Sequence, residues 1–206
     1  MKDRASSPTY DLSVYRQVAL LHIDGINKGF LATLGIPFLT LLYEAIDKSP
    51  SSVLLIEQQG DCVIGYVSGG IGMKPIYRKL LSRFPSLMCA LIPSLLRPSR
   101  LKRIIEIVRY GGSTSQEGAD LLPKFELLSI VVAPEARGTG CAERLYTRLM
   151  LHCESHSIDG FKIVVGDALL PAHRFYQRMG AVQSGRVEVH KGEGSIIYIQ
   201  KISRME

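Results

Sequence analysis

The chain has 206 residues, of which 46% are hydrophobic and 21% charged, and these ordinary globular values exclude disorder as its dominant state. A chain of this length is expected to form one domain with a self-sufficient core, and four cysteines without CxxC spacing exclude a zinc ribbon or a disulfide framework. The net charge of +6 does not indicate a nucleic-acid-binding protein, because the segment Lys74–Arg109 holds nine Lys and Arg residues against one acidic residue.

The N-terminal part predicts a short strand and then helices. We expect a strand near Tyr10–Tyr15 and short helical turns through Val18–Leu34. A Gly-Ile-Pro sequence ends these turns, and Pro37 suits the first turn of a helix that runs to about Asp47. No apolar stretch follows the charged first residues, so we expect no signal peptide and a cytoplasmic location.

Two strands and a basic insertion come next. Ser52–Gln59 and Cys62–Ile71 are expected to form a hairpin, because Gly60-Asp61 between them is typical of a tight turn. We interpret residues 74–120 as an insertion into the domain. Its first part has apolar residues at helical spacing, interrupted by prolines, and its last ten residues are polar and glycine-rich, which predicts a flexible loop.

The C-terminal half alternates strands and helices. The expected elements are a strand at Phe125–Ala133, a helix from Gly140 to Ser155, a strand at Phe161–Gly166, a helix at Pro171–Met179, and a hairpin of Val182–His190 with Ser195–Ile202. This order predicts the α/β (α+β) class, with a central sheet between layers of helices.

The most informative stretch is a glycine-containing loop between a buried strand and a helix. Residues 132–142 read VAPEARGTGCA. A helix N-terminus has free backbone N–H groups and a fractional positive charge. Gly138 and Gly140 have no Cβ, so the backbone can approach a ligand closely, and Arg137 adds a charged fork suited to phosphate. The loop therefore predicts a pyrophosphate site. It is neither a Walker loop nor a Rossmann fingerprint, whose third glycine would fall at Glu143.

Two blocks of the sequence match a third pattern. The loop has the form [RQ]-x-x-G-x-[GA] after a V-x-P strand end, and Ala172–Ala181 has the form A-x-x-[LF]-Y-x-x-x-G-[FA]. Together they resemble the coenzyme A loop and the later tyrosine segment of the GNAT superfamily of N-acetyltransferases. The resemblance covers residues 51–71 and 125–202, and the N-terminal helices more loosely. It implies the GNAT fold, a mixed central sheet flanked by helices, with residues 74–120 as an insertion within one domain, 1–206.

The resemblance also implies a reaction and a set of site residues. Acetyl passes from acetyl-CoA to a primary amine by direct attack, without a metal. The backbones of Ile130 and Val132 would bind the pantetheine arm, and Tyr176 would protonate the departing thiolate. The acetyl-CoA-binding residues implied are Ile130, Val131, Val132, Arg137, Gly138, Thr139, Gly140, Cys141 and Ala142. The sequence departs from the family where many members have Asn seven residues before the tyrosine, because this position is Leu169.

Alternatives remain for the catalytic side chains. Glu126 enters the central strand beside the expected cleft and is our first candidate for the base; a solvated carboxylate is the other interpretation. His22, His173 and His190 are weaker candidates. Tyr176 lies at helical spacing with other apolar residues, so it also fits a core aromatic.

The acceptor and the basic insertion also leave alternatives open. The acceptor is expected to be the amine of a small molecule, with amino sugars as one class, and nucleic acid is not expected. Residues 74–109 fit first of all a lid or a homodimer element, and the alternative is a peripheral contact with anionic membrane. A non-catalytic acyl-CoA-binding module on the same fold would keep the glycine loop and dispense with Tyr176. A protein amine as acceptor is the third alternative.

Overall fold

A computed structural model of the protein describes residues 10–26, 31–81, 122–190 and 193–202. The helices and strands, in chain order, are α1 (Leu12–Gly25), η1 (Leu31–Leu34), α2 (Ile36–Asp47), β1 (Ser52–Gln59), β2 (Cys62–Ile71), α3 (Lys74–Leu81), β3 (Phe125–Val132), η3 (Pro134–Ala136), α6 (Cys141–Ser155), β4 (Gly160–Gly166), α7 (Leu170–Arg178), β5 (Val182–His190) and β6 (Glu193–Lys201). The described strands form one sheet in the order β1-β2-β3-β4-β6-β5.

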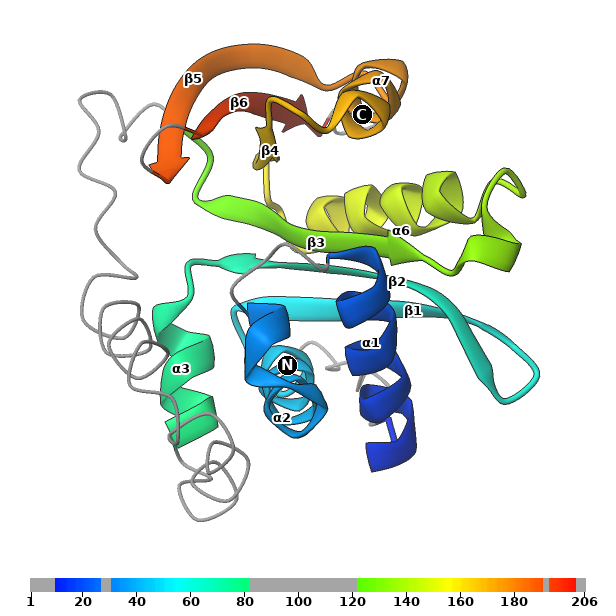
Figure 1. The fold of residues 1–206 in the computed structure, drawn as a ribbon. Coiled ribbons are helices and arrows are strands. Elements are labelled where there is room, and N and C mark those ends of the chain that lie inside the picture. The colour runs from blue at the N-terminus through cyan, green and yellow to red at the C-terminus, as the bar shows by residue number, and fades with distance from the viewer. Residues whose placement is uncertain (1–9, 27–30, 82–121, 191–192, 203–206) are drawn as a thin grey trace.

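Helices cover both faces of this sheet (Figure 1). One buried cluster joins α1, α2 and α3 to the sheet, and a second joins α6 and α7 to its other face. Neighbouring strands are antiparallel except β3 and β4, which are parallel. The predicted class, a mixed sheet flanked by helices, is confirmed.

The expected strand at Tyr10–Tyr15 is wrong, because this segment enters helix α1. The buried side chains of α1 are Tyr15, Val18, Ala19 and His22, which recur at the i, i+3, i+4 and i+7 spacing of one helical face. The apparent alternation of Tyr10, Leu12 and Val14 is too short to outweigh this longer period. As a consequence, the insertion follows the second strand of the sheet and not the third.

The strands and helices predicted from Pro37 to Ile71 and from Phe125 to Ile202 are confirmed to within about two residues. The helical turns expected through Val18–Leu34 correspond to α1 and η1, and residues 27–30 between them are not described. The β1–β2 hairpin turns at Gly60-Asp61 as expected, and α2 begins one residue before Pro37. An unpredicted irregularity lies between β2 and β3, where Ser68 pairs with Ser129 and Gly69 pairs with Leu127. Leu128 is therefore an extra residue, a β-bulge. Leu127 packs in the core under α6, whereas Leu128 and Val131 contact the core under α1 and α2.

The two parallel strands at the centre of the sheet pair over a short distance only. Among the described residues, β3 and β4 are matched at Phe125 with Phe161, Glu126 with Lys162 and Leu127 with Ile163. Beyond Leu127, β3 continues against β2, while β4 continues against β6. The two strands therefore separate, and half of the backbone N–H and C=O groups in the second part of β3 face away from β2.

The insertion lies mostly outside the described residues. Its first eight residues form α3, as the helical spacing predicts, and residues 82–121 are not described. The lid, dimer and membrane interpretations of 74–109 thus stay predictions, as does a single domain over 1–206. In the described part of the chain, no helix is both long and apolar enough to cross a membrane.

Candidate active site

The glycine loop connects the end of β3 to the start of α6. After the 3-10 turn η3 the chain passes through Gly138 (φ 76°) and Gly140 (φ 78°), both in the left-handed region that favours glycine. A Cβ at Gly138 would meet no atom within 4 Å, so the loop is open on that side. No described side chain caps the first turn of α6, which contains Cys141 and Ala142. The Glu143 carboxylate, in the same turn, hydrogen-bonds to its own backbone N–H, so the N–H groups of Cys141 and Ala142 are the ones suited to an anion.

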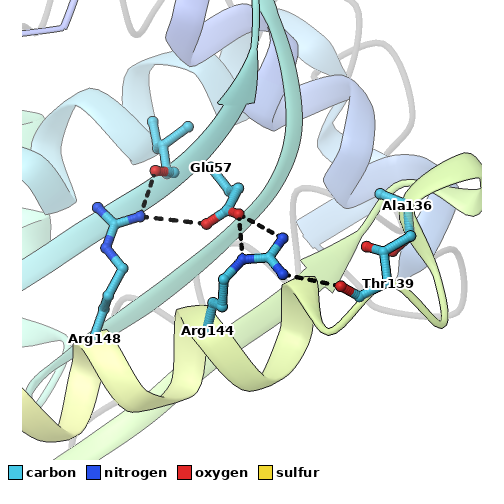
Figure 2. A network of polar contacts seen from close by, with 6 residues as sticks. Glu57, Ala136, Thr139, Arg144 and Arg148 are labelled. Atoms are coloured by element: carbon cyan, nitrogen blue, oxygen red, sulfur yellow. Dashed lines mark hydrogen bonds and ion pairs between the residues drawn. The ribbon is translucent and has the colours of Figure 1, made fainter.

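Two arginines on α6 contact Glu57 of β1, and one of them, Arg144, also binds the glycine loop (Figure 2). Arg144 donates through Nη1 to the Thr139 carbonyl oxygen at 2.9 Å and through Nε to a carboxylate oxygen of Glu57, on β1, at 2.7 Å. Arg148 lies 3.7 Å from the other oxygen of Glu57. The Thr139 hydroxyl donates to the Ala136 carbonyl at 2.7 Å. Exposed ion pairs each contribute about 0.2–1 kcal/mol, so these contacts mainly orient the loop.

Two residues of β3 point their backbone N–H and C=O groups to the side where β4 separates from β3. The Ala133 N–H donates to the Ile64 carbonyl on β2, and successive residues of a strand point their backbone groups to opposite sides. Ile130 and Val132 therefore face away from β2. The exposed Arg137 lies on this side, with Nε 3.4 Å from the Val132 carbonyl oxygen. These are the residues that the resemblance assigns to the pantetheine arm and the pyrophosphate.

The side chains of Cys141 and Val131 belong to the core. Cys141 is 1% exposed, and a Cβ added at Gly65 of β2 would lie 3.0 Å from its Sγ. Burial raises the pKa of the Cys141 thiol, with a smaller contribution from Glu57. The thiol is therefore neutral and packed, which leaves the backbone N–H as the group that Cys141 offers a ligand. Val131 packs against the end of α1, beside Gly25.

Tyr176 lies in a buried aromatic cluster between α6 and β6. It is 6% exposed, and its ring centroid is 6.0 Å from that of Tyr146 and 6.4 Å from that of Tyr198. Burial raises the pKa of the Tyr176 phenol, so the group keeps its proton near neutral pH. The ring is thus a core aromatic, as one interpretation expected, and its hydroxyl still carries a proton to donate. The acid role of Tyr176 stays a prediction.

Glu126 lies where the two central strands are about to part. Its neighbour across the parallel pair is Lys162, and Oε2 of Glu126 is 3.4 Å from Lys162 Nζ, with both side chains partly exposed. The ion pair links β3 to β4 at the closed end of the separation. Glu126 is therefore near the position where a base is expected, with one carboxylate oxygen on Lys162.

A buried polar cluster under α1 and α2 was not predicted. His22 Nδ1 is 2.6 Å from the Tyr43 hydroxyl, which is 2.7 Å from the Tyr66 hydroxyl and 3.3 Å from Ser129 Oγ. Ser129 is in turn 2.7 Å from Ser68 Oγ. The cluster draws on α1, α2, β2 and β3, so no short sequence motif marks it. Its one sequence signal is a serine in each of two buried strands. The side chain of His190, another candidate base, is outside the described part.

His22 is expected to make the fold less stable in mild acid. Burial lowers the pKa of His22 to about 4, below the ordinary value of about 6.5. Between these values the unfolded chain binds a proton that the folded chain does not, so stability is complete above pH 6.5 and falls as the pH drops. The expected loss is about 2 kcal/mol by pH 5.

The matched variant for this prediction is His22→Gln, which keeps a hydrogen-bonding group and does not titrate. Urea unfolding of both proteins at pH 7 and pH 5 isolates the contribution of His22, because every other group is shared. The stability advantage of the wild type should shrink on acidification. An unchanged difference between the two proteins would contradict a buried neutral imidazole.

The sequence was compared with models of known protein families. Residues 104–181 match the model of the acetyltransferase (GNAT) family. No curated protein sequence gives a significant match to the chain.

Several solved structures have a similar fold. An N-acetyltransferase from Staphylococcus aureus Mu50 has a TM-score of 0.61 at 11% identity, over 95% of this chain and 96% of that one. A protein from Desulfovibrio desulfuricans assigned to the GNAT family has a TM-score of 0.57 at 15% identity, over 98% of both chains. A Bacillus anthracis protein assigned as a streptothricin acetyltransferase, solved with acetyl coenzyme A, has a TM-score of 0.50 at 14% identity, over 77% of this chain and 67% of that one.

At these identities the structural likeness establishes the fold, and the family model adds the sequence evidence for the loop and the tyrosine segment. The chain therefore has the fold of the GNAT acetyltransferases, and its residues 104–181 match the model of the acetyltransferase (GNAT) family.

Proposed function

We propose that the chain transfers the acetyl group of acetyl-CoA to a primary amine of a small molecule. The observation that carries this proposal is the separation of β3 from β4 next to the uncapped N-terminus of α6. The separation leaves the backbone of Ile130 and Val132 without a partner from β4, and the helix N-terminus provides N–H groups for a pyrophosphate. A structural neighbour solved with acetyl coenzyme A supports the choice of ligand.

The pyrophosphate and the pantetheine arm of acetyl-CoA each have matching groups on this chain. The pyrophosphate lies on the N–H groups from Gly138 to Ala142, with Arg137 beside it. The pantetheine arm pairs with the backbone of Ile130 and Val132 as an added strand would. Such charge-assisted and backbone contacts bind coenzyme A without help from the acceptor.

The chemistry proposed is a direct displacement at the thioester. The amine nitrogen attacks the carbonyl carbon, a C–N bond forms, and the C–S bond breaks. The departing thiolate takes the proton of the Tyr176 hydroxyl, and the proton released by the amine passes to Glu126 or to water. A proton from water then returns to the Tyr176 phenolate, which restores the phenol. Burial raises the pKa of the Tyr176 phenol, so the hydroxyl keeps its proton until the thiolate forms.

An amine screen tests the proposal. The purified chain is incubated with acetyl-CoA and a panel of amino sugars, polyamines, amino acids and peptides, while free coenzyme A thiol and acetylated products are measured. The expected result is thiol release that depends on an amine and gives the matching amide. Binding of acetyl-CoA without transfer to any class would favour the non-catalytic module, and transfer only to peptides would favour a protein amine as acceptor.

A further inference from the structure

Helix α7, which carries Tyr176, is short and has a weakly defined N-terminal end. It has nine residues, and no side chain caps its N-terminus. Leu169 and Leu170, at this end, are 55% and 63% exposed. The side chains of α7 that are buried in the described structure are His173 and Tyr176. A helix of this length is marginal on its own, so its placement depends on its side-chain contacts. Ala172, Phe175 and Met179 pack partly buried against the core, and His173 and Tyr176 are the buried contacts.

His173 uses both ring nitrogens, and the geometry defines its tautomer. Nε2 lies 3.1 Å from the carbonyl oxygen of Gly166, and Nδ1 lies 3.0 Å from the hydroxyl of Tyr198. A carbonyl oxygen only accepts, so Nε2 carries the hydrogen. In the neutral ring Nδ1 is then the acceptor, and the Tyr198 hydroxyl donates to it. The imidazole therefore fastens α7 to the end of β4 and to β6.

This fastening is directly connected to Tyr176. His173 precedes Tyr176 by three residues, so both side chains lie on the same side of α7. The ring of Tyr198 contacts both, with centroid distances of 5.7 Å to His173 and 6.4 Å to Tyr176. Leu169 contributes a backbone N–H to the same Gly166 carbonyl but has no polar side chain. Arg178, at the other end of α7, makes an exposed ion pair with Glu143 of α6, whereas His173 is buried. His173 is thus the buried polar side chain of α7 that ties this helix to β4 and β6.

We propose that His173 is the positioning residue of the site: by tying α7 to Gly166 and Tyr198, it holds the Tyr176 hydroxyl where the leaving thiolate forms. This inference rests on the proposed function, because it needs Tyr176 as the acid. A misplacement of about 1 Å can cost on the order of 100-fold in rate. We therefore expect His173→Leu to lower kcat by roughly 10–100-fold. The KM for acetyl-CoA should change little, since the loop before α6 is untouched.

A double-mutant cycle with Tyr176→Phe separates positioning from a general structural effect. If His173 acts through the Tyr176 hydroxyl, adding His173→Leu to the Tyr176→Phe protein should lower kcat by less than about twofold further. If the fold-losses in kcat of the two single variants multiply in the double variant, the proposal for His173 is overturned, while the proposed acetyl transfer is unaffected. Wild-type turnover of Tyr176→Phe would refute the acid role and this role of His173 together.

Further variants guard against a simple loss of folding. Tyr198→Phe keeps His173 and removes the donor to its Nδ1, so it should give a smaller loss of the same kind. Tyr146→Phe is the matched control, because it removes a buried hydroxyl that bonds to Gln200 at 3.0 Å and does not touch His173. Its kcat should stay near wild type.

Hydrogen exchange tests the anchoring without any need for activity. His173→Leu should speed amide exchange in α7 and leave α6 unchanged. Unchanged protection of α7 would overturn the proposal even if the chain transferred no acetyl group.

Discussion

Acetyl-CoA at a hundredfold excess over its dissociation constant is expected to raise the melting temperature by roughly 5–11 °C, and Gly140→Val is expected to abolish this rise. Linkage gives about 2.7 kcal/mol of stabilisation at that excess, and a chain of this size gains about 2–4 °C per kcal/mol. Gly140 has φ 78°, a conformation that a β-branched residue adopts only with strain of about 1–2 kcal/mol. Its Cβ would also lie 3.3 Å from Arg144 Nη1. The substitution should therefore displace the N–H groups that receive the pyrophosphate.

Gly185→Val is the matched control for this experiment. Gly185 lies in β5, has no positive φ, and a Cβ there would meet no atom within 4 Å. This variant should keep the full acetyl-CoA shift. The strain at Gly140 is expected to lower the melting temperature of the unliganded protein by a few degrees only, which circular dichroism would verify. A normal shift in Gly140→Val would remove the loop from the binding site.

Tyr176→Phe is expected to lower kcat by at least tenfold with little change in the affinity for acetyl-CoA. The substitution keeps the ring, and with it the contacts to Tyr146 and Tyr198, and removes only the hydroxyl. A positioned acid contributes about 10²–10⁴ in rate, and its proton is needed only when the thiolate leaves. Steady-state rates of coenzyme A release, with acetyl-CoA binding measured separately, check both halves of the prediction.

The control for Tyr176→Phe is again Tyr146→Phe, which removes a hydroxyl from the same cluster. If both variants lose turnover equally, the aromatic cluster supports the fold and the acid role is lost. If neither loses turnover, the thiolate leaves without an acid from this cluster.

Local patterns were sufficient for much of the fold. The β1–β2 hairpin is encoded by two β-branched runs around Gly60-Asp61, and α2 by its proline start and apolar face, so both follow from neighbouring residues. The secondary structure of the first ten described residues was harder to predict. There a strand-like alternation competes with a helical face, and packing against α2 and the sheet decides for the helix.

Features set by distant partners were beyond the sequence patterns. The bulge at Leu128 depends on how β3 pairs with β2. The paired serines next to it, Ser68 of β2 and Ser129 of β3, are 61 residues apart in the sequence. The glycine loop is contiguous and was found from its spacing. The contacts of His173 join α7 to β4 and β6, and those of His22 join α1 to α2 and β2, so neither has a local signature. Both histidines were proposed only as bases, and the structure gives both a buried hydrogen-bonding role.

A crystal structure of the chain with acetyl-CoA is the most direct test of this account. We predict that the pyrophosphate lies on the backbone N–H groups of residues 138–142. The pantetheine arm is predicted to run along Ile130 and Val132, between β3 and β4. The sulfur is predicted to lie within hydrogen-bonding reach of the Tyr176 hydroxyl. An acetyl-CoA molecule bound on another surface, or an arm that does not enter between these two strands, would contradict it.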